Sequence, residues 1–234
     1  MPDDAADAAL LDNQLAFLAA HRGAVRRSRD AIEVVGDSPD FSVWIPLSTA
    51  TELPADARTV RLVPWSGDGW EERLLRAGFE PTHVLVHMEA PVEGAADEPL
   101  VAVASDAEAA DFAEVQAAAF LDPEEADYDW WRKEFVERAV QNYREQALYL
   151  LRVDGHPAAT TLVLRTGPVT GVYAVATKPQ YRGRGLATRL LGQARRDAAG
   201  GRLTLQVVEG SDAERLYLSL GFRCAFRSPH FRRP

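Results

Sequence analysis

The segment VYAVATKPQYRGRGLATRLL, Val172–Leu191, has residue types that could bind phosphate groups. Strand-forming residues run into a turn punctuated by Gly183 and Gly185, and an amphipathic helix follows. The first N–H groups of a helix lack partners within it and carry the positive end of its dipole, so they can hold phosphate oxygens. Glycines let the backbone come close to such a ligand, and Arg182 and Arg184 add positive charge. The pattern therefore predicts a phosphate-binding turn.

Two common phosphate-binding motifs do not fit this turn. The Walker pattern requires a Lys-Ser/Thr pair after its last glycine, and the dinucleotide-binding fingerprint requires a third small residue where this sequence has Thr188. We therefore expect a different kind of phosphate cradle.

These residues resemble the motifs of the GNAT superfamily of N-acetyltransferases. The central motif of that family is Gln/Arg-x-x-Gly-x-Gly/Ala, which Gln180, Gly183 and Gly185 match. The family's closing strand–helix–strand has an LY..LGF sequence, matched here by LYLSLGF, Leu216–Phe222. The resemblance covers about residues 99–234. It implies the acyl-CoA N-acyltransferase fold, which is an α/β fold with a mixed sheet.

The resemblance implies that acetyl-CoA is bound mainly through backbone groups. The pantetheine arm is expected to pair like an extra strand with the strand before the turn, and the pyrophosphate to sit on the amides of the turn. The implied residues are Val175, Ala176 and Thr177 for the arm, and Arg182, Gly183, Arg184, Gly185, Leu186, Ala187 and Thr188 for the pyrophosphate.

The resemblance further implies that Tyr217 lies near the thioester sulfur and protonates the leaving thiolate. A phenol with an ordinary pKa of about 10 keeps its proton at pH 7 and can still hydrogen-bond a developing thiolate. The alternative is a tyrosine that only packs in the terminal helix.

Transfer to an amine also requires a base, because the amine must be neutral when it attacks. Glu209 is the first candidate, since it follows a predicted strand whose end should face the acyl group. The alternative is a solvated loop carboxylate. The family often has an asparagine seven residues before the tyrosine, where this chain has Gly210, and this departure leaves the base open.

Contacts to the acceptor amine are expected from the segment AFLDPEEADYDWWRKEF, Ala119–Phe135, by analogy with the family. Its acidic and aromatic residues could recognise a cationic, partly apolar amine through charge and cation–π contact. The candidates are Asp127, Tyr128, Trp130 and Trp131. The alternative is an exposed acidic loop before a helix whose tryptophans pack inward.

Charge divides the chain near residues 91–99. Residues 1–99 hold 8 Arg, no Lys and 18 acidic residues, a net charge of −10, whereas residues 100–234 have a net charge of +1. The segment APVEGAADEP, Ala90–Pro99, gives little to bury and suits an exposed connection. We therefore expect an N-terminal α/β domain at 1–90, a linker at 91–99 and a GNAT N-acetyltransferase domain at 100–234.

Hydrophobic periodicity and turn residues predict alternating helices and strands in both parts of the chain. Upstream, leucines at 11, 15 and 18 indicate a helix, and a second helix is predicted at Trp70–Ala77, with strands at Ile32–Val35, Phe41–Ile45, Val60–Val63 and Thr82–Met88. Downstream, the predicted strands are Leu100–Ala104, a hairpin of Leu148–Val153 and Ala158–Arg165, then Gly171–Thr177, Leu203–Val208 and Phe222–Arg227. The predicted helices there are Ala107–Phe120, Trp130–Asn142, Leu186–Ala199 and Asp212–Leu220.

An internal repeat relates the two parts at an offset of 143 residues. Val60–Phe79 aligns without gaps to Leu203–Phe222, and both segments predict strand, loop, helix and Gly-Phe. The identical positions are few, so a generic strand–helix unit remains an alternative to duplication. The upstream copy has Leu74 in place of Tyr217 and no phosphate-binding turn, which predicts one active site, in the C-terminal half.

Composition excludes several classes of protein. The single cysteine, Cys224, excludes an internal disulfide framework and a cysteine-rich metal site, and the five histidines have no metal-ligand spacing, so we expect no metal. A net charge of −9 disfavours nucleic acid and anionic membranes. The acidic N-terminus and the lack of a long apolar run indicate a cytoplasmic protein. A homodimer is expected by analogy only.

The leading hypothesis is a CoA-dependent N-acyltransferase, with acetyl as the expected acyl group and a primary amine of a small molecule or peptide as acceptor. A second hypothesis is a non-catalytic acyl-CoA-binding or sensing protein that keeps the fold without turnover. A third is that the acidic N-terminal half binds a basic partner and the transferase half supports it. The acceptor itself stays open.

Overall fold

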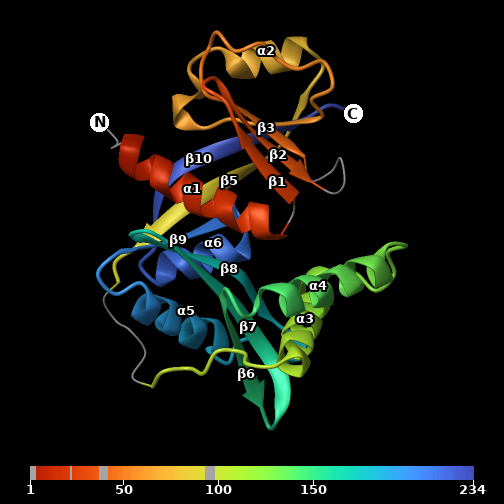
Figure 1. The fold of residues 1–234 in the computed structure, drawn as a ribbon, viewed down its shortest axis with the longest axis vertical. Helices are drawn as coiled ribbons and strands as arrows, with labels where there is room; N and C mark the ends of the chain where they lie inside the picture. Colours follow the sequence, from red (N-terminus) through yellow and green to blue (C-terminus); the bar gives the residue numbers. More distant parts are fainter. Residues whose placement is uncertain (1–3, 22, 37–41, 93–97) are drawn as a thin grey trace. The chain divides into compact units, whose positions relative to one another are not determined.

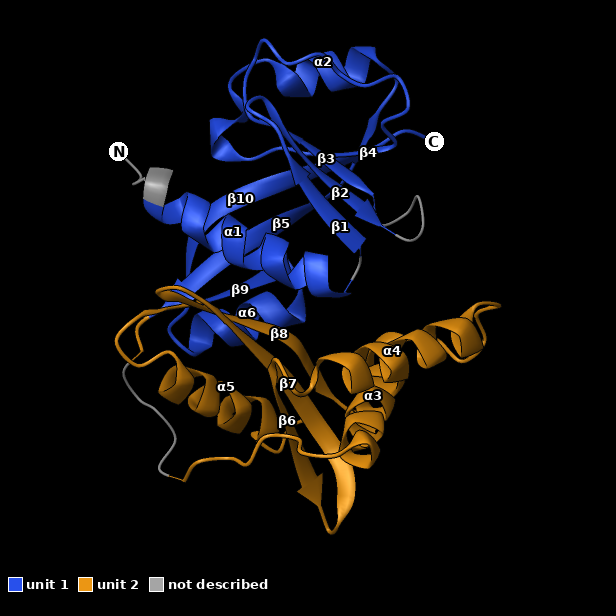
Figure 2. Cartoon of the chain, in the orientation of Figure 1, with its two compact units in different colours: residues 1–90, 204–234 blue, residues 91–203 orange. Residues whose placement is uncertain are grey.

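The computed structural model describes residues 4–21, 23–36, 42–92 and 98–234, and Figure 1 labels most of its helices and strands. Contacts divide the chain into two compact units, which Figure 2 distinguishes by colour. Unit 1 comprises residues 1–90 and 204–234, and unit 2 comprises residues 91–203. Grouping by contact does not test domain boundaries along the sequence. The boundaries expected above, 1–90, 91–99 and 100–234, therefore remain a prediction.

Unit 2 is an antiparallel set of strands with helices. Its elements are α3 (Asp106–Phe120), α4 (Tyr128–Asn142), β6 (Ala147–Val153), β7 (His156–Thr166), β8 (Val169–Thr177), the short 3-10 helix η3 (Pro179–Tyr181) and α5 (Leu186–Asp197). β7 pairs with both β6 and β8. The predicted hairpin is confirmed: Asp154 and Gly155 have φ values of 51° and 80°, as a two-residue turn of this kind requires.

The strand predicted at Leu100–Ala104 is wrong. Only Ala102 pairs, in an isolated bridge with Tyr149. The backbone N–H of Leu100 instead donates to the Gln193 side chain at 2.8 Å. A short run of β-forming residues becomes a strand only where a neighbouring strand pairs with it over several residues. Here the pairing is a single bridge.

Unit 1 contains the N-terminal elements and the last elements of the chain. They are α1 (Asp4–His21), β1 (Gly23–Arg27), β2 (Ala31–Gly36), β3 (Val43–Pro46), β4 (Thr59–Arg61), the short 3-10 helix η2 (Pro64–Ser66), α2 (Trp70–Arg76), β5 (Glu80–Ala90), α6 (Asp212–Ser219) and β10 (Arg223–Arg232), with β9 (Arg202–Val208) from Thr204 onward. The strand order is β1-β2-β3-β4-β10-β5-β9. The sequence did not predict β1, which is short and largely exposed. Phe41, expected in β3, lies outside the described residues.

Within unit 1, the last strand of each copy of the repeat lies beside the first strand of the other copy. β4, α2 and β5 form one copy, and β9, α6 and β10 form the other, yet β10 lies between β4 and β5 while β5 lies between β10 and β9. Both helices end in the same way. Phe79 N–H donates to the Leu74 carbonyl and Phe222 N–H to the Tyr217 carbonyl, each at 3.0 Å. The repeat is therefore a structural one.

The β5–β10 ladder is symmetric at the same offset of 143 residues. Rings of His83 and His230 stack with centroids 4.3 Å apart, and the equivalent rings of Phe226 and His87 stack at 4.0 Å. The ladder has one irregularity between Cys224 and Phe226 and another between His230 and Phe231, where β5 skips Thr82. The first skips Ala225, which is Thr82 shifted by 143. A generic strand–helix unit does not explain this agreement, and a duplication does.

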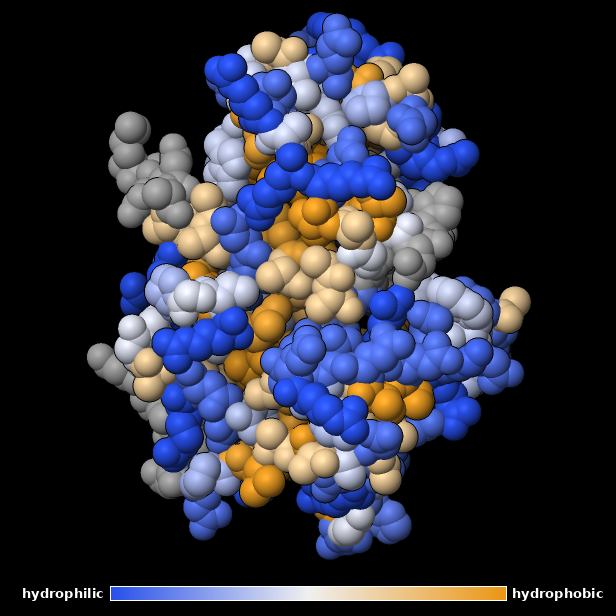
Figure 3. Space-filling view, in the orientation of Figure 1, coloured by the Kyte–Doolittle hydropathy of each residue, from blue (hydrophilic) through white to orange (hydrophobic). Residues whose placement is uncertain are grey.

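No helix among the described residues is both long and apolar enough to cross a membrane. The face drawn in Figure 3 mixes hydrophilic and hydrophobic residues, as the surfaces of folded proteins usually do.

Two histidines of the symmetric ladder are buried and uncharged. His87 is 0% exposed and His230 is 7% exposed. Burial, with the nearby Arg61 guanidinium, lowers the pKa of His230 to about 3 and the pKa of His87 well below its usual value. The native protein therefore takes up fewer protons than the unfolded chain as the pH falls below the ordinary histidine pKa.

Acid should for this reason destabilise the protein. Between pH of about 6.5 and about 4.5, His230 alone should lower the free energy of unfolding by about 2–3 kcal/mol. Urea denaturation at both pH values measures the loss. In His230→Phe, which keeps a ring to stack on His83, the pH dependence should shrink, whereas in the control His156→Gln, at an exposed position, it should not change. An unchanged pH dependence in His230→Phe would contradict the assignment.

Candidate functional site

The predicted phosphate-binding turn is the connection between β8 and α5. β8 ends at Thr177, η3 redirects the chain, and α5 begins at Leu186 with Gly185 as its N-cap. Gly183 and Gly185 have φ values of 75° and 72°. This left-handed conformation costs glycine little and other residues considerably more, which explains the glycine at both positions.

The backbone N–H groups of residues 183–188 have no acceptor among the described residues. The first hydrogen bond of the helix is donated by Arg189 to the Gly185 carbonyl at 3.1 Å, and no side chain caps the N-terminus. The helix is 12 residues long, so the positive end of its dipole lies at the same place. The turn thus presents several free donors that can hold anionic oxygens.

The space above the turn is open. A Cβ atom built on Gly183 or Gly185 meets no other atom within 4 Å. The glycines are therefore required by their backbone conformation and by access to the turn, and not by packing within the protein. A diphosphate approaching these amides fits the residues present.

The side chains of Arg182 and Arg184 are not both free to contact a ligand above the turn. Arg182 Nε donates to the Thr177 carbonyl at 3.2 Å, which ties its side chain to the end of β8. The Arg184 guanidinium lies 5.4 Å from the centre of the Tyr181 ring. Both residues are exposed. The backbone donors, more than these side chains, define the predicted phosphate site.

A bulge precedes the turn in β8, which sequence analysis did not predict. The pairs Leu162–Tyr173 and Thr160–Ala176 enclose it, and Ala174 has a φ of 53° although it is not glycine. The Thr160 hydroxyl donates to the Ala174 carbonyl at 3.3 Å. Bulges and left-handed non-glycine residues occur often beside functional sites. Alanine has no preference for this conformation, so no sequence signal could have found it.

Val175, Ala176 and Thr177, the residues predicted to pair with the pantetheine arm, follow this bulge directly. Ala176 and Thr177 pair with Thr160 and Ala159 on β7, so one side of their backbone is already used. The structure brings these three residues and the turn together within unit 2.

Tyr217 lies on α6, in unit 1. It is 7% exposed, and its ring packs 5.7 Å from that of Phe222. Burial raises the pKa of Tyr217 to about 12. Its hydroxyl donates no hydrogen bond to any described residue, so the phenol is protonated and available as a donor.

Glu209 directly follows β9, also in unit 1. Its Oε1 accepts a 2.6 Å hydrogen bond from Arg227 Nε, and its backbone N–H donates to the Val84 carbonyl at 2.9 Å. The Arg227 guanidinium therefore binds one of the two oxygens of the Glu209 carboxylate. The neighbouring Gly210 N–H donates to Glu214 Oε2 at 2.6 Å, which satisfies the backbone at the position where the family often has asparagine.

The residues predicted to bind the acceptor lie at the start of α4. Asp127 is the N-cap, and its Oδ2 accepts a 2.8 Å hydrogen bond from Trp131 Nε1. Trp130 is 48% exposed and meets Trp131 edge to face, with ring centroids 4.4 Å apart. The alternative in which the tryptophans pack inward therefore does not hold for Trp130. Tyr128 is half-buried in the first turn of the helix.

Residues 109–222 match the family model described as the acetyltransferase (GNAT) family. This part of the chain is a GNAT-family domain. It includes the free amides of the turn, the bulge in β8 and Tyr217. No curated protein matches the chain.

Solved structures share the fold over most of the chain. The GCN5-related N-acetyltransferase from Kribbella flavida has a TM-score of 0.66 at 18% identity, covering 97% of this chain and 95% of that one. A GNAT-family acetyltransferase from Colwellia psychrerythraea has a TM-score of 0.58 at 13% identity, with 98% and 97% covered. A tandem GNAT protein from the clavulanic acid biosynthesis pathway has a TM-score of 0.56 at 14% identity, with 88% and 80% covered. The likeness in fold thus extends over the N-terminal half of the chain as well.

No group of three or more His, Cys, Asp or Glu side chains that could hold a metal ion is present in the described part of the chain.

Proposed function

We propose that the protein is an acetyl-CoA-dependent N-acetyltransferase whose acceptor is a primary amine of a small molecule or peptide. The observation that carries the proposal is the turn of residues 183–188, where free backbone donors, two left-handed glycines and open space coincide in a GNAT-family domain. Its single free cysteine, Cys224, also fits the reducing cytoplasm as its location.

Acetyl-CoA supplies an activated acetyl thioester, and attack by a neutral amine on its carbonyl forms the amide and releases the thiolate. The turn holds the pyrophosphate through backbone N–H groups, and Val175, Ala176 and Thr177 orient the pantetheine arm. Tyr217 donates its phenolic proton to the thiolate. Glu209 takes the proton that the amine nitrogen loses, directly or through water, with the carboxylate oxygen that Arg227 leaves free.

A non-catalytic acyl-CoA sensor is the second candidate. It is favoured by the 2.6 Å hydrogen bond from Arg227 to Glu209, which competes with the role of Glu209 as base. A sensor would bind acyl-CoA with the same turn and show no turnover.

Calorimetric titration with acetyl-CoA, followed by a thiol-release assay over a panel of primary amines, tests both candidates. Binding in the micromolar range together with amine-dependent thiol release supports the enzyme. Binding without release for any amine supports the sensor. A folded protein that binds neither acetyl-CoA nor longer acyl-CoAs would overturn both.

The exposed Trp130 provides a test of the acceptor site. Trp130→Ala should raise the KM for the amine about two- to fivefold, because cation–π contacts at exposed sites contribute about 0.5–1 kcal/mol. The dissociation constant of acetyl-CoA should not change. Val101→Ala, at another exposed apolar position, serves as the control. An unchanged KM for every accepted amine would remove α4 from the acceptor site.

A further inference from the structure

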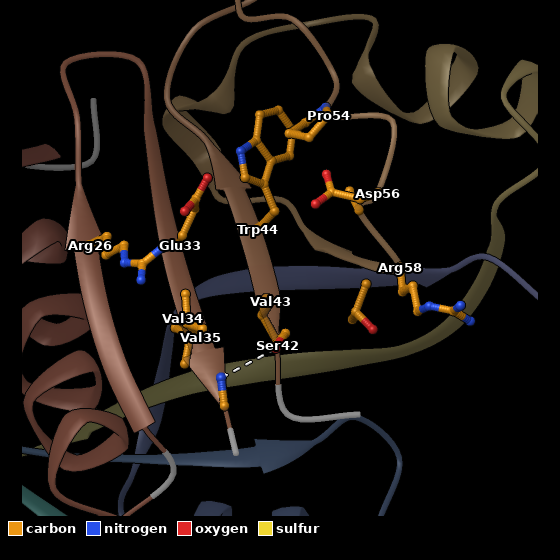
Figure 4. A pocket seen from close by; sticks show the side chains of 13 residues that line it. Arg26, Glu33, Val34, Val35, Ser42, Val43, Trp44, Pro54, Asp56 and Arg58 are labelled. Carbon is orange, nitrogen blue, oxygen red and sulfur yellow. Dashed lines mark hydrogen bonds between the residues drawn. The ribbon is translucent and has the colours of Figure 1, made fainter. Parts of the chain in front are cut away.

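Unit 1 contains a pocket that the proposed transferase does not use. Its volume is about 470 Å³, and Figure 4 shows its lining from β1, β2 and β3 and from the segment that leads into β4. All of these elements belong to the N-terminal half, which has no phosphate-binding turn.

The pocket exists because the N-terminal half lacks a helix that the C-terminal half has. In the C-terminal half, α5 follows β8 and packs on the strands of unit 2. The corresponding connection after β3, residues 47–58, contains no helix. Leu53 and Ala57 cover the core around Trp44 and Trp70, but the segment leaves part of the strand face open.

The strand register brings charged and aromatic side chains to this open face. Glu33 on β2 is the cross-strand partner of Arg26 on β1 and of Trp44 on β3. Directly paired residues of neighbouring strands have side chains on the same face. The segment after β3 contributes Pro54, Asp56 and Arg58 to the pocket wall.

The charged side chains of the pocket are open to solvent: Arg26, Asp56 and Arg58 are exposed, and Glu33 is half-buried. The side chains of Arg26, Glu33, Asp56 and Arg58 form no ion pair or hydrogen bond with any residue that the structure describes. Trp44 is only 5% exposed, yet its indole N–H donates to no described residue. This N–H is not among the buried unpaired atoms of the described residues, so it reaches the pocket and can donate to water or to an oxygen of a ligand.

The directions of the side chains favour a cationic ligand over an anionic one. Figure 4 shows the Glu33 and Asp56 carboxylates on opposite sides of the Trp44 indole, with Asp56 turned toward it. The Arg58 guanidinium points away from the indole, and Arg26, on β1, is separated from the indole by Glu33 on β2. The surrounding half of the chain, residues 1–99, has a net charge of −10, which attracts cations.

We propose that this pocket binds a small organic cation: an amine that is protonated at neutral pH and carries an apolar body. The ammonium group pairs with Glu33 and Asp56 and lies against the indole, where a cation gains electrostatic attraction from the ring. The apolar body contacts Pro54. An oxygen on the ligand would accept the Trp44 N–H.

Titration of the full chain with benzylammonium, without acetyl-CoA, tests the proposal. We expect a dissociation constant of about 1 mM or below. Benzyl alcohol and benzoate, which have the same ring and no positive charge, should bind at least about tenfold more weakly. Equal binding of the three probes, or no binding of benzylammonium, would overturn the proposal. Because acetyl-CoA is absent, the result is independent of the proposed acetyl transfer.

Single substitutions locate the binding. Glu33→Gln and Asp56→Asn should each raise the dissociation constant of benzylammonium about fivefold, because each removes one charge and little volume. Glu52→Gln is the matched control, since Glu52 is an exposed acid of the same 47–58 segment outside the pocket lining. Unchanged thermal unfolding of the variants shows that they fold. Equal affinities in both pocket variants and the control would place the binding elsewhere and overturn the proposal.

Discussion

Replacing Tyr217 with phenylalanine should lower kcat about 10²–10⁴-fold, the usual contribution of a general acid. The substitution removes one oxygen and keeps the ring that packs on Phe222. The phenol donates no hydrogen bond within the described residues, so its loss leaves no partner unsatisfied and should barely change stability. Since the phosphate-binding turn is untouched, the dissociation constant of acetyl-CoA should stay within about twofold. Steady-state thiol release and calorimetry measure the two quantities.

Tyr143→Phe is the control for this prediction. Its hydroxyl donates to Asp106 at 2.8 Å on the surface of unit 2, so the variant loses a phenol without touching the proposed chemistry, and its kcat should not change. A Tyr217→Phe variant with normal kcat would assign the tyrosine to packing alone. A wild-type protein that binds acetyl-CoA without turnover would instead identify a sensor.

Replacing Gly185 with valine should raise the dissociation constant of acetyl-CoA about 100-fold or more. A β-branched residue at a φ of 72° is strained by about 1–2 kcal/mol. Its side chain would also fill the open space where the pyrophosphate approaches the amides. Both effects act on the ligand-binding conformation of the turn. Calorimetric titration of the folded variant with acetyl-CoA measures the loss.

Gly200→Val separates the loss of the site from simple backbone strain. Gly200 has a φ of 79°, and a Cβ there also meets no atom within 4 Å, but it lies beyond the C-terminal end of α5. This variant should lose similar stability and bind acetyl-CoA normally. Equal affinities in the two variants would show that the turn does not bind the pyrophosphate.

Local signals in the sequence determined the turn, the helices and the repeat. Within twenty residues, strand-forming residues are followed by Gly183, Gly185 and an apolar helix face. This segment therefore predicts strand, turn and helix without knowledge of the rest of the chain. The Gly-Phe endings of α2 and α6 are equally local, because the helix stop needs a left-handed glycine. The family resemblance rests on these same short segments.

The tertiary structure decided which strands are neighbours and which groups are left unpaired. The pairing of β5 and β10, the stacked rings of His83 and His230, and the failure of Leu100–Ala104 to form a strand depend on partners far away in the sequence. The bulge at Ala174 and the unpaired indole of Trp44 depend on register and on a missing helix. Periodicity encodes the preference of a segment for helix or strand, but pairing is settled by the free energy of the whole sheet.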